Sequence, residues 1–313
     1  MGKTENLSDS RGNAFGIRFF LLMLKILGIN RTCEFVWVIA LFYTCFDRKA
    51  REAAKPYLSH RFPGAGRLAM FRHTWALFTS QGQALVESAA MIRNGLQWDF
   101  IDEELSERLM DQEKGFLLLT SHFGAWNAIM GGLHVARKPV NILVTPDRNA
   151  NVDKTLALTG LKNPVRIIST KSGMGGLIEV FDAIERGEIV CMMGDRCLEG
   201  EGIELEFLGG KARFPSAAFY LAARCGCAVL PLFAVRTHRH TRFAALYGPE
   251  MRPVLKGRKR SALQPYLEIY VRKLEELSRK YPYQCFLFED IWSPVQEKDM
   301  ADPEAVPHGT HPA

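Results

Sequence analysis

From about residue 115 onward, short apolar runs alternate with segments of helical character, and this alternation limits the folds open to the chain. The runs that read as strands are residues 116–119, 140–144, 165–169, 189–193, 228–235 and 243–247. Helices are expected at residues 126–136, 177–186, 215–226 and 264–280. Strands that alternate with helices are typical of a layered α/β domain. The sequence therefore predicts a mainly parallel sheet flanked by helices.

The N-terminal part is apolar without being a good membrane span. Residues 15–29 are interrupted by Arg18 and Lys25, which share one helix face, and a second apolar run covers residues 35–46. A helix of 12 residues spans roughly 18 Å, short of the ~30 Å hydrocarbon core. We expect interfacial helices in a membrane surface, with their cations at the headgroups. A helical hairpin buried in the domain is the alternative.

These patterns predict three parts. Residues 1–48 form membrane-associating helices, residues 49–298 an α/β domain that opens with helices at 47–63 and 66–94, and residues 299–313 a disordered tail.

The charge and the cysteines narrow the partners and the compartment. A net charge of +6 suits anionic lipid headgroups, an acidic carrier protein or nucleic acid. Cations gather at residues 236–242 and 252–260 without interleaved aromatic residues, which argues against nucleic acid. The seven cysteines form no Cys-x-x-Cys pair, so neither a zinc site nor a redox motif is predicted. An odd number of cysteines without a regular spacing, in a sequence without a secretory signal, indicates a protein of a reducing compartment.

Three polar loops follow predicted strands, at residues 121–127, 145–149 and 194–196. Parallel α/β sheets place their ligand sites at the carboxyl ends of strands. His122, at such an end, has the chemistry of a general base, because imidazole can take a proton from an attacking hydroxyl near neutral pH. Gly124 lies in the same loop, and Asn127 can orient the ring through one hydrogen bond without supplying charge. The alternative is that His122 has only a structural role, with its ring hydrogen-bonded to backbone groups.

The remaining candidates carry charge. Asp195 and Arg196 either form an ion pair that shapes a loop or contact substrate, and Arg148 has the same two interpretations. Lys211 lies in a glycine turn before a predicted helix start, a place that favours anions, or else it is a solvated charge in an ordinary turn. No G-x-x-x-x-G-K-[ST], G-x-G-x-x-G or G-x-S-x-G motif is present, which argues against nucleotide-binding and serine-hydrolase readings.

Several blocks together resemble the late acyltransferases of bacterial lipid A biosynthesis, within the lysophospholipid and glycerolipid acyltransferase superfamily. The resemblance covers roughly residues 15–295. Its blocks are the apolar N-terminal segment, His122 with four residues before Asn127, Gly194-Asp195-Arg196, Phe207 to Ala212, Gly226 to Pro231, and Tyr281-Pro282-Tyr283-Gln284.

The resemblance implies a membrane-associated enzyme without metal or redox cofactor. A fatty acyl group would pass from an acyl carrier protein or coenzyme A thioester to a hydroxyl of a lipid or glycolipid. His122 would deprotonate that hydroxyl, and Arg148, Arg196 or Lys211 would meet acceptor phosphates or the oxyanion. The implied location is the cytoplasmic face of the bacterial inner membrane, as a peripheral or monotopic protein.

Two positions depart from the family pattern. Asn127 stands where the family has Asp or Glu, and Cys285 where it often has Trp. Three interpretations of Asn127 follow: it orients His122 in a slower enzyme, another carboxylate such as Asp195 supplies the charge, or the protein is a catalytically impaired lipid-binding or scaffold protein.

Overall fold

The computed structural model describes most of the chain. The described residues are 14–94, 97–100, 103–126, 137–144, 166–169, 174–197, 202–237, 240, 242–255 and 260–293. The tail expected at 299–313 and the helix expected at 126–136, apart from its first residue, lie outside them.

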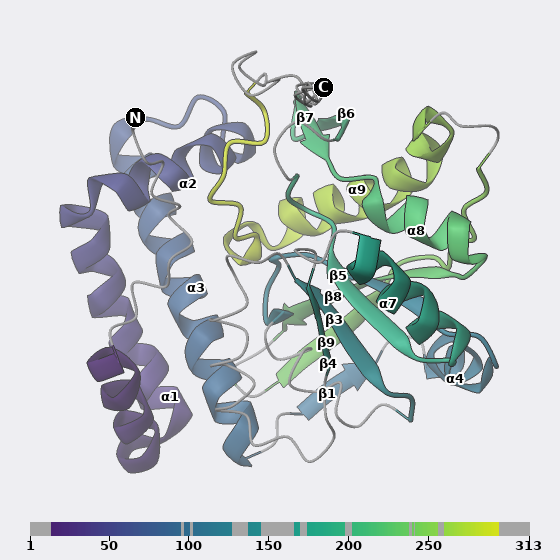
Figure 1. Ribbon diagram of the computed structural model, residues 1–313. Coiled ribbons are helices and arrows are strands. Elements are labelled where there is room, and N and C mark those ends of the chain that lie inside the picture. Colours follow the sequence, from purple (N-terminus) through teal and green to yellow (C-terminus); the bar gives the residue numbers. More distant parts are fainter. Residues whose placement is uncertain are drawn as a thin grey trace, which may run out of the picture.

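Three helices open the described chain and lie together at the left of Figure 1. α1 (Ala14–Phe46) covers both apolar runs and is kinked at Gly28, whose φ of 73° interrupts the helix. α2 (Arg48–Arg61) begins after Asp47, whose side chain accepts a hydrogen bond from the Ala50 amide. α3 (Arg67–Asn94) runs along α1, as Figure 1 shows. Among the described helices none is long and apolar enough to cross a bilayer.

A seven-stranded sheet forms the centre, in the order β1-β9-β8-β2-β5-β3-β4. Its strands are β1 (Gln97–Phe100), β2 (Phe116–Thr120), β3 (Val140–Val144), β4 (Arg166–Ser169), β5 (Ile189–Met193), β8 (Val229–Arg236) and β9 (Arg242–Tyr247). Neighbours pair in parallel except β8 and β9, so the mainly parallel sheet flanked by helices is confirmed. β1 and α4 (Glu103–Asp111) are elements that the sequence did not predict.

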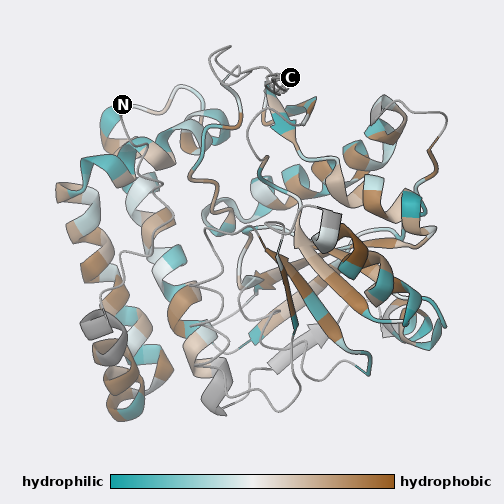
Figure 2. Ribbon diagram, in the orientation of Figure 1, coloured by the Kyte–Doolittle hydropathy of each residue, from teal (hydrophilic) through white to brown (hydrophobic). Residues whose placement is uncertain are grey.

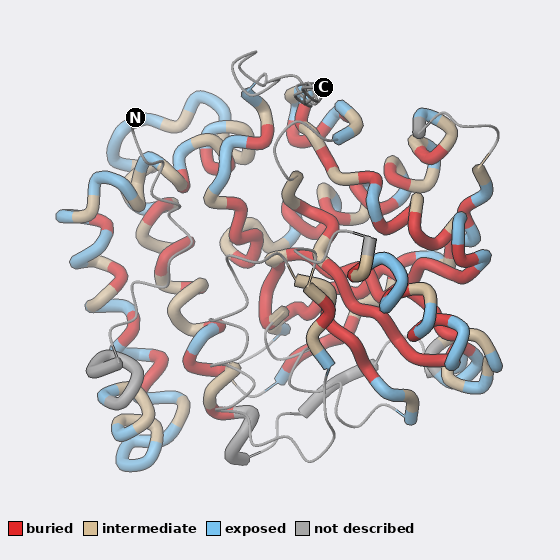
Figure 3. The backbone as a smooth tube through the Cα atoms, in the orientation of Figure 1, coloured by how far each residue is buried: buried red, intermediate tan, exposed pale blue. Residues whose placement is uncertain are grey.

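Helices cover both faces of this sheet. Along β2, Leu117 and Leu119 face a core shared with α7 (Met174–Glu185), α8 (Ala217–Cys225) and α9 (Gln264–Lys280). Phe116 and Leu118 face a second core, which α4 closes with Leu109. A strand whose side chains alternate between two apolar layers is buried throughout, and the strands in Figure 3 are mostly red.

One region differs from the predicted arrangement. β6 (Ile203–Phe207) and β7 (Gly210–Phe214) form an antiparallel hairpin outside the main sheet. The glycine turn that the sequence placed before a helix is the turn of this hairpin, and α8 begins only after Ser216. Short 3-10 turns, η4 (Arg260–Leu263) and η5 (Pro282–Gln284), flank α9.

Candidate active site

Two adjacent strands of the sheet end at the site. β2 and β5 run in parallel, with Phe116 opposite Ile189 and Thr120 opposite Met193. Continuing this register by two residues sets His122 opposite Asp195. The amide of Gly194 donates to the Thr120 carbonyl at 2.9 Å, so the pairing persists beyond the strand ends. The sheet therefore brings together two residues that are 73 positions apart.

Asp195 holds His122 through three contacts. Its Oδ1 and Oδ2 lie 3.1 and 3.0 Å from the imidazole Nδ1. Its Oδ2 also accepts the His122 backbone amide at 2.9 Å. The side chain of Asp195 is only 2% exposed and that of His122 is 11% exposed, so both are largely shielded from water. The ring is thus fixed in position and orientation by a buried carboxylate.

The ionisation of Asp195 fixes the tautomer of the ring. Burial alone would raise the pKa of Asp195, but His122, its hydrogen bonds and Arg196 outweigh burial and lower this pKa to about 2. The carboxylate is then an acceptor only, so Nδ1 of His122 carries the hydrogen. Nε2 consequently presents its lone pair, which is the state required to accept a proton.

The loop after His122 is fixed by backbone contacts. The Gly124 amide donates to the Gln284 carbonyl at 2.6 Å, and the Ala125 amide donates to the Ala234 carbonyl at 3.0 Å. Gly124 has a φ of +56°, and a Cβ there would lie 1.8 Å from the carbonyl oxygen of Ala234. Only glycine fits this close approach without displacing β8.

Comparison with known proteins decides the family. The family model described as bacterial lipid A biosynthesis acyltransferase matches residues 3–271. The chain belongs to this family. It is therefore an acyltransferase of the lipid A biosynthesis type, and the resemblance to the acyltransferases of bacterial lipid A biosynthesis that the sequence indicated is confirmed.

One solved structure is distantly similar to the chain. The crystal structure of the 1-acyl-sn-glycerophosphate (LPA) acyltransferase, PlsC, from Thermotoga maritima covers 79% of this chain and 98% of that chain, at 15% identity and a TM-score of 0.39. No curated protein matches the chain.

In this acyltransferase, Arg196 connects the active site to the segment that follows α9. Its Nη2 donates to the Phe286 carbonyl and its Nη1 pairs with Glu289, each at 3.1 Å. The Phe286 amide in turn donates to the His122 carbonyl at 2.8 Å. Arg196 therefore does not pair with Asp195 as the sequence allowed. It fastens the segment that borders the histidine loop.

The other residues singled out from the sequence fall in different places. Asn127 and Arg148 lie outside the described residues. Lys211 pairs with Glu204 across the β6–β7 hairpin at 3.3 Å and is 71% exposed, so its described contact is with a neighbouring strand. Tyr270 of α9 was not anticipated as a support. Its buried hydroxyl donates to the Thr120 carbonyl at 3.0 Å, and no local motif distinguishes it from an ordinary core tyrosine.

Proposed function

We propose that this acyltransferase moves a fatty acyl group from an acyl carrier protein or coenzyme A thioester to a hydroxyl of a lipid or glycolipid. The observation that supports this reaction is the contact of His122 with the buried carboxylate of Asp195. A histidine whose Nδ1 hydrogen is held by a carboxylate is a general base at Nε2, and it needs no covalent intermediate to serve an incoming hydroxyl.

In the proposed reaction, Nε2 of His122 accepts the proton of the acceptor hydroxyl as its oxygen attacks the thioester carbonyl carbon. The carbon–sulfur bond of the resulting tetrahedral intermediate then breaks, and the imidazolium returns the proton to the departing thiolate. Asp195 stabilises the imidazolium between the two steps and does not itself take the proton. Asp195 thus supplies a charge that Asn127 lacks.

An apolar surface on α1 supports attachment to a membrane. Large apolar side chains are exposed along this helix, and Figure 2 shows brown segments on its outer turns. They are Phe19, Leu22, Ile26, Leu27, Phe35, Trp37, Val38, Phe42, Tyr43 and Phe46. An apolar surface of this extent, on a kinked helix that is not long and apolar enough to cross the bilayer, fits a helix lying in the interface. We place the enzyme on the cytoplasmic face of the bacterial inner membrane.

The donor is proposed from charge and compartment. The net charge of +6 favours an acidic carrier protein over a neutral partner, and coenzyme A, which carries phosphates, fits the same charge. Both donors present the same thioester to His122, so the proposed chemistry does not depend on which one binds.

A product assay tests this function. Purified wild-type protein is incubated with acyl carrier protein thioesters or acyl-coenzyme A and a total bacterial lipid extract, and new lipids are sought by mass spectrometry. The proposal expects a lipid whose mass increases by one acyl group, with release of one thiol per acyl group transferred. Asn127→Asp, run beside the wild type, shows whether a second carboxylate raises the rate. A folded wild type that acylates no lipid with either donor contradicts the proposed reaction.

A further inference from the structure

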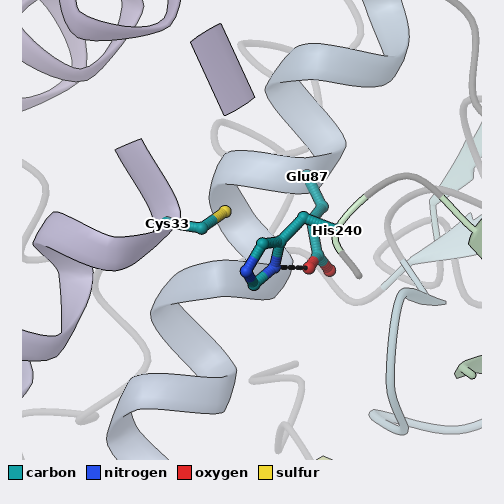
Figure 4. Close-up of side chains that lie close together, drawn as sticks. All are labelled: Cys33, Glu87 and His240. Carbon is teal, nitrogen blue, oxygen red and sulfur yellow. Dashed lines mark hydrogen bonds and ion pairs between the residues drawn. The ribbon is translucent and has the colours of Figure 1, made fainter. Parts of the chain in front are cut away.

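A second cluster of reactive side chains lies apart from His122, where α1, α3 and the turn after β8 meet. Cys33 of α1, Glu87 of α3 and His240 converge there, as Figure 4 shows. One ligand atom from each residue can be chosen so that all three lie within 4.8 Å of one another. Cys33 and Glu87 are fully buried and the side chain of His240 is 19% exposed. The acyl-transfer chemistry proposed for this enzyme uses none of them.

The donor set is one that proteins use for zinc. Thiolate sulfur, imidazole nitrogen and carboxylate oxygen are the ligand types of Zn²⁺ sites, and three of them leave a fourth position for water. Close approach of the helices makes the convergence possible, because a Cβ on Gly82 would lie 2.6 Å from the Cγ1 of Val36. The sequence carried no such signal, since the ligands are far apart and follow no recognised spacing.

An unsatisfied oxygen points to a ligand. Oε1 of Glu87 lies 2.9 Å from both Nη1 of Arg236 and Nδ1 of His240. Oε2 of the same carboxylate is buried, and within the described part of the chain it has no hydrogen-bond partner. A buried carboxylate oxygen without a partner is unfavourable and calls for an explanation such as an ion. The Glu87 carboxylate therefore keeps the capacity to accept a further ligand such as a cation.

The surroundings suit a neutral complex. A divalent ion bound by the Glu87 carboxylate and the Cys33 thiolate has no net charge, so it does not repel Arg236 strongly. Arg236 is also held by Gln83 at 2.8 Å and by the hydroxyl of Ser80 at 2.7 Å. Arg236 then acts as the outer partner that orients a ligating carboxylate, as is common around protein-bound metals.

We propose that Cys33, Glu87 and His240 bind a Zn²⁺ ion that fastens α1 to the α/β domain. On binding, the Cys33 thiol loses its proton to solvent, and one ring nitrogen of His240 and a carboxylate oxygen of Glu87 complete the protein ligands. The ion joins three segments that are distant in sequence. Because α1 carries the exposed apolar surface, the site fixes the orientation of that surface relative to the active site.

Spectroscopy with Co²⁺ tests the site in the full-length protein. Metal is removed with a chelator under reducing conditions, and Co²⁺ is titrated while absorbance is followed. The proposal expects one ion per chain, a thiolate-to-Co²⁺ charge-transfer band in the near ultraviolet, and loss of both signals when Zn²⁺ is added. Saturation with Co²⁺ without a thiolate band, or no binding, overturns the proposal.

Variants assign the ligands. Cys33→Ser should abolish the charge-transfer band, and Glu87→Gln, which preserves the shape of the side chain, should weaken binding at least about tenfold. Cys45→Ser removes an exposed cysteine of the same helix and should leave band and affinity unchanged. A band that survives in Cys33→Ser, or disappears in Cys45→Ser, contradicts the assignment.

Thermal melting supplies a readout that does not depend on the cysteine variant being folded. A bound ion stabilises the folded state by mass action, so Zn²⁺ should raise the melting temperature of the wild type and of Cys45→Ser. The same Zn²⁺ concentration should raise that of Glu87→Gln less. Equal shifts in wild type and Glu87→Gln would show that the ion binds elsewhere and overturn the site.

Discussion

Asp195→Asn is the substitution that best tests whether His122 needs the charge of its carboxylate partner or only a hydrogen-bonding side chain of the same size. The amide has the size of the carboxylate and can still accept a hydrogen bond from Nδ1 of His122, but it carries no charge. In the wild type the oxygen and nitrogen are 3.0 Å apart and the carboxylate is 2% exposed. The variant removes the electrostatic stabilisation of the imidazolium that forms during attack, and an amide N–H that donates to Nδ1 would lower the activity further by reversing the tautomer.

The magnitude follows from Coulomb's law. Unit charges about 3 Å apart interact by about 5 kcal/mol at an effective dielectric constant of ~20. A neutral hydrogen bond that the amide retains offsets about 1 kcal/mol. The remaining loss of about 4 kcal/mol corresponds to a fall in kcat of roughly a thousandfold.

The assay is acyl transfer at saturating donor and acceptor, with kcat and KM measured separately. We expect kcat to fall while KM for both substrates changes little, because the charge acts on the transition state. Glu188→Gln is the matched control. Glu188 is also a buried carboxylate, bound to Arg186 and Asn141, so its loss affects stability without touching His122. A kcat for Asp195→Asn within threefold of wild type, in a variant that still unfolds cooperatively, would refute the reasoning.

Three further predictions concern stability and attachment. Gly124→Ala should destabilise the fold by more than about 3 kcal/mol in denaturant unfolding, since its Cβ would meet the Ala234 carbonyl, whereas Gly209→Ala, with φ +79° and open space, should cost only about 1 kcal/mol. The folded pKa of Asp195 is about 2, below the usual value of 3.8, so its stabilisation is present above pH ~4 and is lost as the pH falls to ~2. Asp195 should therefore contribute about 2 kcal/mol to the fall in the free energy of unfolding over this pH range, and this contribution should be absent in Asp195→Asn. A pH dependence of stability that is the same in wild type and Asp195→Asn would contradict the lowered pKa. Replacing Phe42 and Phe46 of α1, which are 60% and 75% exposed, by Ser should weaken flotation with anionic vesicles at least about tenfold, while Leu177→Ser with Ile178→Ser, exposed on α7, should not.

The sequence predicted the elements whose pattern is local. The strands at 140–144 and 189–193 and the helix at 264–280 have the bounds of β3, β5 and α9, because apolar runs and amphipathic periodicity need no tertiary information. β1 was missed because its four residues form a strand only by pairing with β9. The β6–β7 hairpin was missed because its Gly209-Gly210 turn resembles the approach to a helix, although Ile203, Leu205 and Phe207 alternate as a strand does.

The candidate site was predictable in part for a similar reason. Polar loops after apolar strands are visible in a sequence, and His122 and Asp195 stand in two of them. That these loops touch depends on β2 and β5 being neighbours in the sheet, and strand order is set by the paths of the crossovers rather than by any local motif. Because Asn127 replaces the expected acid, the sequence indicated that any charge beside His122 would have to come from another carboxylate. The contact of Asp195 with Nδ1 of His122 depends on the register in which β2 and β5 pair, and this register cannot be read from the spacing of residues in the sequence. The cluster of Cys33, Glu87 and His240 could not be predicted in this way, because two of its residues, Cys33 and Glu87, do not belong to polar loops that follow predicted strands.

The measurement that tests the account most directly is the rate of acyl transfer by His122→Ala beside wild type, with the acylated lipid quantified by mass spectrometry. The account predicts that the product formed by wild type disappears in His122→Ala, while the variant still binds vesicles and unfolds cooperatively, at a lower melting temperature because the buried Asp195 carboxylate loses its partner. Product formation by a folded His122→Ala at a rate near that of wild type would contradict the assignment of His122 as the general base.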